Sequence, residues 1–536
     1  MEKRFLFAFF ISFLFITIYS ILRTPHQSDF FKKEPASLAL EKNFYTRPEQ
    51  MVLSKEQATP SLRANELNIE EKEEQIETDK IIVHFSNIGG KLKNFSLKEY
   101  NHSLPITNMI NFQQDENIIF HSEQSSPNSI IYSFIENGTT IVKKYTVSSQ
   151  QEYLIRLDIS VNKKKFFKMS NNKYFTAFSI DFSQLNNKKY SSAEQTLFEY
   201  SIFTKDQMIR KANLIKFSQK NDIEKILPVK WVGFRDRYFC LIIQPEFSIK
   251  GYTTQTVTEQ KLNINLDFEE ILMQEHEDLN FKYNIYVGPQ QASILNQYDP
   301  TFTEIISFNN IGLFDFIAKG IHSLIVMLHK IIPNWGICII FTSVFIYLLT
   351  YPFTVKSITA MKKIQIIQPK ISKLREQHKN NPQKLNKETM ELYKEQNINP
   401  LAGCLPMICQ IPIFIGLYQV LWRSIIFRGE GFLWIKDLSE PDRLFTFPSQ
   451  LPFIGHELNI LPVLMSLLMF FQQKMSIQNV PLSDPAQAAQ QKMMTTFFPI
   501  LLGFFLYRFA SGVSLYFTVS YFLSFLTQWK LSQKIK

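Results

Sequence analysis

The residue types that usually carry out catalysis do not form a recognisable site in this sequence. The nine histidines are scattered, and none lies near cysteines or acidic residues at the spacing of a metal site. The chain has no glycine-rich phosphate loop and no HExxH or CxxC motif. Ser511, in the segment FASG, is similar to a nucleophile turn, but no histidine accompanies it in the apolar segments. We therefore expect no catalytic residue, metal or cofactor, and interpret Ser511 as a small packing residue.

Polar residues that recur at helical spacing inside apolar segments are a stronger signal. Ser343, Tyr347 and Thr350 follow one another at intervals of four and three residues, which places them on one helix face. A similar row near the end of the chain comprises Ser511, Ser514, Thr518, Tyr521 and Gln528. Glutamines in or beside other apolar segments are Gln410, Gln472 and Gln473. Because unpaired polar groups are costly in hydrocarbon, these side chains either join neighbouring helices or line a wet cavity.

The overall composition resembles that of a soluble protein only because it averages two extremes. The 536 residues carry a net charge of +10 and are 45% hydrophobic and 20% charged, with a mean hydropathy of −0.09. The 16 glycines exclude a collagen-like chain, and four cysteines exclude a disulfide scaffold. The hydrophobic fraction excludes global disorder. A polar half precedes an apolar half.

The N-terminal segment Phe5–Leu22 carries no charge and follows Lys3 and Arg4. It approaches the length needed to cross a bilayer and lacks the small-residue pattern of a cleavage site. We interpret residues 1–23 as an uncleaved signal anchor, with a cleaved signal peptide as the alternative. Residues 24–79 are polar and contain four prolines and most of the charge run EEKEEQIETDK. They are predicted to form a flexible linker.

Residues 80–305 are predicted to form an all-β sandwich domain on the outer side of the membrane. Short alternating runs such as IIVHF and YLIRLDISV are separated by turn residues, and NIGGKL at 87–92 is a turn signal.

Residues 306–332 are predicted to form an amphipathic helix that lies in the membrane interface. Asp315, Lys319 and His322 fall on one side, whereas Phe314 and Ile317 fall on the other. The alternative is an ordinary membrane span, which its ionisable residues disfavour.

Residues 333–536 contain five further apolar runs, which with the anchor make six predicted spans. The runs are Trp335–Phe353, Cys404–Trp422, Leu458–Phe471, Met493–Tyr507 and Val513–Trp529. The loop 354–399 carries ten Lys/Arg against four acidic residues, and 425–455 carries three against four. The positive-inside rule therefore places the loop 354–399 and both termini in the cytoplasm.

The loop 354–399 is predicted to form a helical hairpin with a basic surface. Ile364, Ile367 and Ile371 repeat at helical spacing, and a turn follows at 380–382. The basic residues proposed to form the surface are Lys362, Lys363, Lys370, Lys373 and Arg375. Such a surface suits anionic lipid headgroups or RNA phosphates. The alternative is a solvated loop whose charge reflects topology alone.

Several motifs resemble those of the YidC/Oxa membrane insertases. The longest is NPLAGCLPMICQIPIFIGLYQVL at 399–421. Others in the apolar half are YPFTVKS through MKKIQIIQPKI (351–371), WIKDLSEPD (434–442), FFQQKMS (470–476) and FASGVSLYFTVS (509–520). WVGFRDRYF (231–239) and YVGPQ (286–290) resemble the larger form of Gram-negative bacteria, which has a periplasmic domain. The resemblance covers essentially the whole chain, and the ordered set of motifs is highly specific.

The resemblance implies a multi-pass α-helical membrane protein of the bacterial inner membrane, with a five-helix insertase core and a periplasmic β super-sandwich. It implies a hydrophilic groove that is open to the cytoplasm and the bilayer but closed outside. Such proteins insert and fold membrane proteins, alone or with the Sec translocon (SecYEG and SecDF). The expected partners are nascent membrane proteins and anionic lipids, with any ribosome contact at the hairpin. No DNA, cofactor or ATP site is expected.

One departure from the family pattern concerns the groove. Most members place an arginine four residues before the Tyr-Pro pair, where this chain has Tyr347. The arginine is thought to attract acidic residues of a substrate, so its absence puts that role in doubt. Phe517 stands where the family often has Tyr or Trp facing the substrate. The candidate groove residues are Ser343, Tyr347, Gln410, Gln472, Ser514, Phe517 and Thr518.

Two other classes of function remain open. A secondary transporter with a midplane polar site would show internal repeats and charged intramembrane residues, and neither is evident. A membrane hydrolase would need acid–base partners for Ser511.

Overall fold

The computed structural model describes residues 71–534, except for 111, 113–117, 137–138, 149–151, 163–173, 182–193, 195, 206, 213, 215–222, 259–260, 268–277, 379–380, 400–404, 452–454 and 478–491. The described chain forms two compact units. The β unit comprises residues 71–290 and 298–305, and the helical unit comprises 291–297 and 306–534. The predicted N-terminal anchor and most of the predicted linker lie outside the described residues.

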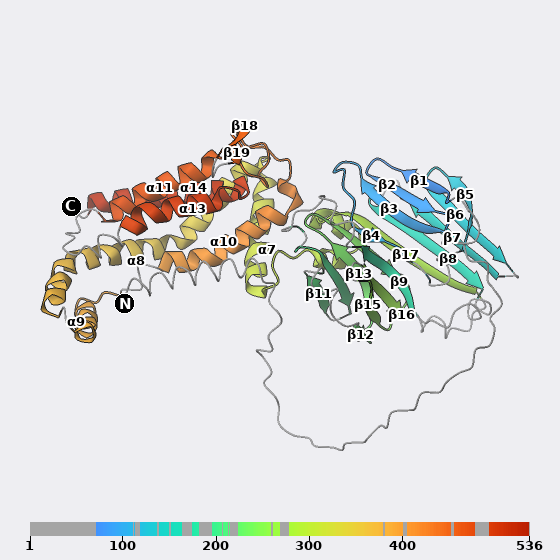
Figure 1. Cartoon of the computed structure of the whole chain (residues 1–536), viewed down its shortest axis with the longest axis horizontal. Helices are drawn as coiled ribbons and strands as arrows, with labels where there is room; N and C mark the ends of the chain where they lie inside the picture. Colours follow the sequence, from blue (N-terminus) through green and yellow to red (C-terminus); the bar gives the residue numbers. More distant parts are fainter. Residues whose placement is uncertain are drawn as a thin grey trace, which may run out of the picture. The chain divides into compact units, whose positions relative to one another are not determined.

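A large antiparallel sheet forms the centre of the β unit (Figure 1). Its nine strands have the spatial order β11-β10-β13-β14-β17-β8-β7-β6-β5. In that order they are Met208–Ala212, Glu199–Thr204, Val229–Arg235, Phe239–Pro245, Asp278–Pro289, Leu154–Asn162, Thr139–Val147, Ser129–Glu136 and His121–Ser126. In β8, Ile155, Leu157 and Ile159 are buried whereas Arg156 and Ser160 are exposed. This alternation of period two gives the sheet one apolar face at β8.

Two smaller sheets complete the β unit. The three-stranded sheet consists of β1 (Glu73–Glu77), β2 (Ile81–Ser86) and β3 (Lys91–Leu97). The five-stranded sheet consists, in spatial order, of β12 (Ile223–Lys225), β15 (Tyr252–Thr258), β16 (Lys261–Asp267), β9 (Tyr174–Asp181) and β4 (Ile106–Thr107).

Both smaller sheets cover the same face of the large sheet. Tyr145 of β7 and Tyr283 of β17 each lie opposite Leu157 of β8, and directly opposite residues share one face. The Tyr145 ring is 4.9 Å from that of Phe85 in β2, and the Tyr283 ring is 5.5 Å from that of Phe175 in β9. One large sheet is thus covered by two small ones, and the predicted β-rich domain is confirmed.

The first strand begins earlier than predicted. β1 lies inside the segment predicted as a linker, yet it pairs with β2 along its whole length. Its one buried residue is Ile76, and its outward glutamates meet lysines: Glu73 pairs with Lys93 and Glu77 with Lys98. The charge run is therefore the solvent-facing side of an edge strand, a position where charges protect against aberrant pairing.

The helical unit begins with α7 (Gly312–His329), whose buried residues are Ala318, Ile321 and Ile325. Leu313 and Phe316 are exposed, so apolar residues occur on both sides of this helix. Asp315 is largely buried and pairs with Lys319 at 3.0 Å. The predicted polar face therefore contributes contacts within the protein as well as contacts with solvent.

The longest helix is α8 (Trp335–Gln377), which has 43 residues and contains Pro352 and Pro369. It joins the second predicted span and the first arm of the predicted hairpin in one continuous helix. The second arm is α9 (Pro382–Glu395), which begins with Asn381 as a side-chain cap and Pro382 in the first turn. A small cluster of Ile367 and Ile371 in α8 and Ile398 just after α9, with Leu392 and Tyr393 of α9 packed against it, holds the two arms together.

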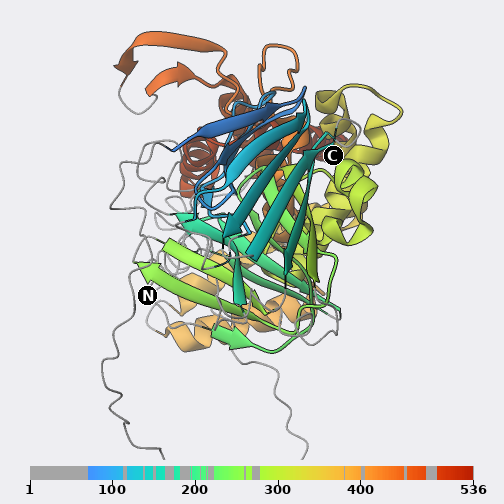
Figure 2. The same ribbon diagram turned by 90° about the vertical axis from the view of Figure 1, so that its right-hand side faces the viewer.

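The last helix, α14 (Ser511–Lys534), contacts α8, α10 (Leu405–Arg423) and α11 (Ile460–Ile477). A π-helical turn (Met493–Phe497) leads into α13 (Phe498–Leu506), and both contact α11. Shorter elements are α6 (Ala292–Tyr298) and the 3₁₀ turn η5 (Ile425–Phe427), whereas the 3₁₀ turn η3 (Pro300–Ile305) belongs to the β unit. The hairpin of β18 (Phe445–Leu451) and β19 (Gly455–Leu458) projects from the ends of the helices (Figures 1 and 2).

Two of the described helices, α7 and α8, are long and apolar enough to cross a membrane by length and composition. Shorter apolar helices are Ile408–Arg423, Ile460–Met475 and Thr495–Leu506. The six predicted spans and the five-helix core stay predictions.

Candidate functional site

The beginning of α14 is built by the preceding loop rather than by a catalytic group. The backbone N–H of Ser511 donates to the Glu440 carbonyl at 2.7 Å, and that of Gly512 donates to the Leu438 carbonyl at 3.0 Å. The Ser511 hydroxyl donates to the Asp437 carbonyl at 3.0 Å. Ser511 thus satisfies the open end of a helix, in agreement with its interpretation as a packing residue.

The beginning of α11 is capped by a buried carboxylate in the same loop. Oδ2 of Asp442 accepts hydrogen bonds from the backbone N–H groups of Ile460 at 2.8 Å and Leu461 at 3.1 Å. The indole N–H of Trp434 donates to the same oxygen at 3.2 Å. A negative charge at a helix N-terminus is favourable, so the motif WIKDLSEPD positions both α11 and α14.

Three of the candidate groove residues reach α14 from three different helices. Gln410 of α10 donates to the Tyr516 hydroxyl at 3.0 Å. Gln472 of α11 donates to the Ser524 hydroxyl at 2.6 Å. The Tyr347 hydroxyl of α8 donates to Thr527 Oγ1 at 2.7 Å and lies 3.3 Å from the Leu523 carbonyl. The structure thus brings these predicted residues together along one helix.

The other candidate groove residues make contacts within the helical unit. The Ser343 hydroxyl donates to the Ile339 carbonyl of its own helix at 2.7 Å, and the Thr518 hydroxyl donates to the Ser514 carbonyl at 2.7 Å. Phe517 is 6% exposed and its ring centroid is 5.5 Å from that of Phe414. These residues lie inside the helical unit, and Phe517 belongs to an aromatic cluster.

Several buried polar atoms have no hydrogen-bond partner among the described residues. Besides the predicted Ser514 hydroxyl, they include the Thr342 hydroxyl and the side-chain carbonyls of Gln419 and Gln473. A buried, unpaired polar group is unfavourable unless water or another polar group meets it. Sequence reasoning selected Gln410 but missed Gln419 in the same apolar segment, and selected Ser343 but missed the adjacent Thr342. Their polarity inside an apolar helix was the available signal.

Only part of the predicted basic surface of the hairpin is exposed to solvent. Lys363, Lys370 and Lys373 are exposed. Lys362, by contrast, donates to the Leu531 carbonyl at 2.8 Å and so ties α8 to the last turns of α14. Arg375 is half-buried.

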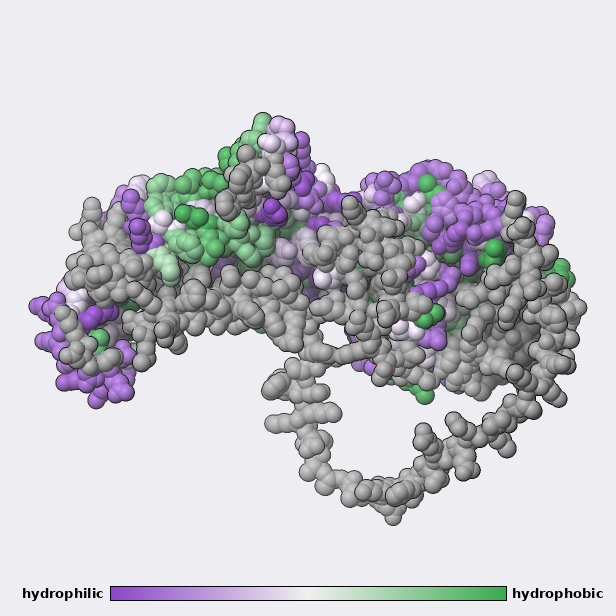
Figure 3. Space-filling model, in the orientation of Figure 1, coloured by the Kyte–Doolittle hydropathy of each residue, from purple (hydrophilic) through white to green (hydrophobic). Residues whose placement is uncertain are grey.

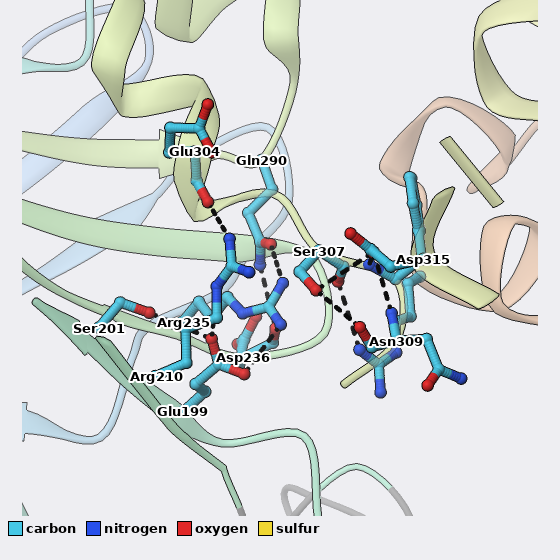
Figure 4. Close-up of polar contacts among 12 residues, drawn as sticks. Glu199, Ser201, Arg210, Arg235, Asp236, Gln290, Glu304, Ser307, Asn309 and Asp315 are labelled. Atoms are coloured by element: carbon cyan, nitrogen blue, oxygen red, sulfur yellow. Dashed lines mark hydrogen bonds and ion pairs between the residues drawn. The ribbon is translucent and has the colours of Figure 1, made fainter. Parts of the chain in front are cut away.

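The chain leaving the β unit is held by a buried ionic cluster (Figure 4). Arg210 of β11 donates to the Glu304 carbonyl and also pairs with Glu199 of β10 at 3.5 Å. The same glutamate pairs with Arg235 of β13 at 3.0 Å, and both side chains are at most 4% exposed. A buried pair of this kind fixes geometry more than it adds stability.

The chain entering the helical unit is held by Asp315 (Figure 4). Oδ1 of Asp315 accepts hydrogen bonds from the backbone N–H groups of Phe308 at 2.7 Å and Asn309 at 3.2 Å. Arg423 of α10 donates to the Ser307 carbonyl at 3.3 Å. We call the segment 304–311 the connector. Its successive residues Ser307, Phe308 and Asn309 are therefore fixed to α7 and α10.

Asp299 fixes the 3₁₀ turn η3 in the β unit. Burial alone would raise the pKa of Asp299, but hydrogen bonds from the side chain and backbone of Thr301 and from Gln244 and Lys230 lower the pKa to about 2. The turn places Thr301 against the indole N–H of Trp231 at 3.1 Å. The bond satisfies the indole N–H of Trp231, whose side chain is fully buried.

The described residues contain no cluster of His, Cys, Asp and Glu that could hold a metal ion. The polar groups of the candidate groove residues are hydroxyls, amides and backbone carbonyls. The chemistry open to this site is therefore the exchange of hydrogen bonds.

Comparisons with known proteins cover both units. The model of the YidC periplasmic domain matches residues 108–324, and that of the 60Kd inner membrane protein matches residues 327–536. The membrane protein insertase YidC of Endomicrobium trichonymphae is 28% identical over 487 residues, or 88% of each chain. That of a Janthinobacterium species is 30% identical over 403 residues, or 75% of this chain and 69% of the relative.

Among solved structures, one of an active YidC insertase with its first transmembrane domain resolved is similar to this chain. The match extends over 86% of this chain and 92% of the insertase chain, with 16% sequence identity and a TM-score of 0.39. The identity to the Janthinobacterium protein extends over more than two thirds of that relative, and the two family models adjoin along the chain. The chain therefore belongs to the family of the membrane protein insertase YidC, in the form that carries a periplasmic domain.

Proposed function

We propose that this protein inserts membrane proteins into the bacterial inner membrane through polar contacts inside its helical unit. Membership of the insertase family supports the activity. The single structural observation that carries the proposed site is the convergence of Tyr347, Gln410 and Gln472 on α14. These contacts come from three helices and use groups that can be exchanged for those of a polypeptide.

The proposed topology has five spans in the helical unit: α8, α10, α11, α13 with its preceding π-helical turn, and α14. Exposed apolar residues support this proposal: Leu464, Leu467 and Phe471 lie on α11, and Ile500 and Phe504 on α13. In Figure 3 hydrophobic residues gather where α11 and α13 lie, whereas the end formed by α9 is hydrophilic. With the N-terminal anchor, this gives six spans, cytoplasmic termini and a periplasmic β unit. α7 then lies in the interface.

In the proposed mechanism, a short polar tail of a nascent chain enters the helical unit from the cytoplasm. Its backbone N–H and C=O groups exchange with the side-chain hydrogen bonds along α14 and with the unpaired groups of Ser514 and Gln473. The polar path across the hydrocarbon is thereby shortened. The adjoining apolar segment then enters the lipid, driven by burial of roughly 25 cal/mol per Å².

The proposed partners follow from the same topology. Nascent membrane proteins are the substrates, and the Sec translocon is a partner for substrates with larger periplasmic parts. The exposed lysines Lys363, Lys370 and Lys373 are proposed to meet anionic lipids, or a ribosome whose RNA phosphates carry the complementary charge.

The proposal is tested by reconstituting the purified chain in liposomes and supplying a small single-span substrate during translation. We expect protease protection of the substrate tail to depend on the chain. Empty liposomes and liposomes with heat-unfolded chain serve as controls. Photocrosslinks from position 347 to the substrate are expected only while the substrate is entering. An absence of insertion, together with uptake of a small solute down a gradient, would instead support a transporter.

A further inference from the structure

Two helices contact the same turn of α14. Tyr347 of α8 contacts the Leu523 carbonyl and the Thr527 hydroxyl. Gln472 of α11 donates to Ser524, which lies between them in sequence. Both side chains therefore meet the same turn, residues 523–527. We call Tyr347, Gln472, Ser524 and Thr527 the hydroxyl cluster.

The hydroxyl cluster lies near the proposed cytoplasmic end of the helices. One turn beyond Thr527, the Leu531 carbonyl accepts a hydrogen bond from Lys362, at the start of the basic hairpin. Toward the other end, Thr518 and Ser514 are deeply buried. A tail that enters from the cytoplasm and reaches Ser514 must pass the level of this cluster.

All four side chains of the cluster are neutral, and the backbone of a peptide can replace each of them as a hydrogen-bond partner. A tyrosine or threonine hydroxyl both donates and accepts hydrogen bonds, as does the amide of glutamine. A polypeptide backbone offers one donor and one acceptor per residue. Exchange of cluster bonds for substrate bonds thus leaves the number of satisfied groups unchanged, and it requires no negative charge in the tail.

We propose that the Tyr347–Thr527 hydrogen bond is a latch that closes the cytoplasmic entrance, and that Tyr347 makes this entrance indifferent to the charge of the tail. The inference rests on the proposed insertase function and deepens it, because it names the selectivity of the same site. The latch holds α8 against α14 when no substrate is present. It opens when the tail's own backbone groups pair with Tyr347, Thr527 and Ser524.

The first experiment removes only the latch hydroxyls. Tyr347→Phe and Thr527→Val each keep the size of the side chain and delete one partner of the 2.7 Å bond. We expect each variant to insert a neutral-tailed substrate about fivefold faster in single-round assays, as expected for the loss of one hydrogen bond. The double variant is expected to match Tyr347→Phe, because that single variant already lacks the bond to Thr527 as well as the contact with the Leu523 carbonyl.

The matched control is Thr359→Val. Its hydroxyl also lies on α8 but is exposed, and among the described residues it donates only to the Val355 carbonyl of its own helix. It should insert substrates at the wild-type rate. Thermal unfolding of every variant shows whether the helical unit is intact, so that a folding defect is not taken for a change of rate.

The second experiment restores a cation at the latch position. Tyr347→Arg is expected to raise the rate ratio of acidic-tailed to neutral-tailed substrates about tenfold, whereas the wild-type ratio is expected to be near one. Three outcomes would overturn the latch. They are an unchanged rate ratio in Tyr347→Arg, a preference of the wild-type chain for acidic tails, and insertion by Tyr347→Phe that is slower than or equal to that of the wild type. Additive effects of the two single variants overturn it as well. If the wild-type chain inserts nothing at all, the proposed function itself has failed.

Discussion

At the scale of the residue, the structure shows which partners a polar side chain finds. Tyr347 was selected from the sequence because it continues a polar row, but its partner Thr527 lies 180 residues away. No local pattern encodes that distance, because the register between two helices depends on packing along their whole length. The same holds for Ser511, whose role became clear only once the Asp437 carbonyl was placed beside it.

Close approach of helices makes one glycine of α13 sensitive to substitution. A Cβ atom at Gly503 would collide with the Ser466 hydroxyl and lie 3.3 Å from the Pro462 carbonyl of α11. We expect Gly503→Ala to destabilise the helical unit by about 1–3 kcal/mol, measured by thermal unfolding in detergent.

The matched control is Gly320→Ala in α7, where an added Cβ meets nothing within 4 Å. Because alanine favours helix, this variant should be neutral or slightly stabilised. Adding Ser466→Ala to Gly503→Ala removes the colliding oxygen and should recover most of the loss. If the double variant is no more stable than the single one, the collision is not the cause.

At the scale of the element, periodicity predicted the types of most segments but not their partners. The alternation in β8 indicates a strand, yet the order of the nine strands follows from long-range pairing that no single strand encodes. β1 was missed because its charged residues face solvent and only Ile76 is buried. α8 was divided at residue 353 by composition, whereas the structure continues the helix through Pro352 and Pro369. Neighbouring groups can re-satisfy the backbone at such prolines.

The cap of α11 gives an element-scale prediction. Asp442 is 2% exposed, and its Oδ2 accepts two backbone N–H groups and the Trp434 indole. Asp442→Ala is expected to cost about 1–2 kcal/mol and to shift the emission of Trp434 as its indole loses a partner.

Glu440→Gln is the control for Asp442→Ala. It changes a side chain that is 40% exposed in the same loop and keeps the Glu440 carbonyl that binds Ser511. It should leave both the stability and the Trp434 emission unchanged. Equal losses in the two variants would argue against a specific cap.

Asp299 gives an expected pH dependence for the β unit. Its pKa is lowered from an ordinary value of 3.8 to about 2, so the carboxylate stabilises the fold fully above pH 3.8. That contribution, at most roughly 2 kcal/mol, is lost as the pH falls from about 4 to about 2. Asp299→Asn should be less stable at pH 7 but lose less stability over this acid range. Parallel acid-unfolding curves for the two proteins would contradict the assignment.

At the scale of the whole molecule, the sequence predicted a β part and a helical part because a polar half precedes an apolar half, with the boundary near residue 306. It did not predict how the connector is held, since Arg210, Glu199 and Arg235 come from three strands whose order was unknown. Likewise, Asp315 looked like a solvent-facing residue of an amphipathic helix until its bonds to Phe308 and Asn309 were seen.

Because the described chain forms two compact units, we expect two separate unfolding transitions. In calorimetry of the full chain in detergent, we expect Asp299→Asn at pH 7 to lower one transition by a few degrees and Gly503→Ala to lower only the other. A single transition that both substitutions move equally would show that the units unfold together.

The unbroken course of α8 has a mechanical consequence. Its 43 residues at about 1.5 Å each give a rod of roughly 65 Å, about twice the ~30 Å hydrocarbon thickness. A rod of this length acts as a lever whose pivot is set by the bond from Lys362 to Leu531. In the proposed topology, a displacement of the lysine-bearing arm by a few ångströms would strain that pivot and the Tyr347 bond 15 residues away. A force applied outside the bilayer would thereby reach the proposed entrance through the helix itself.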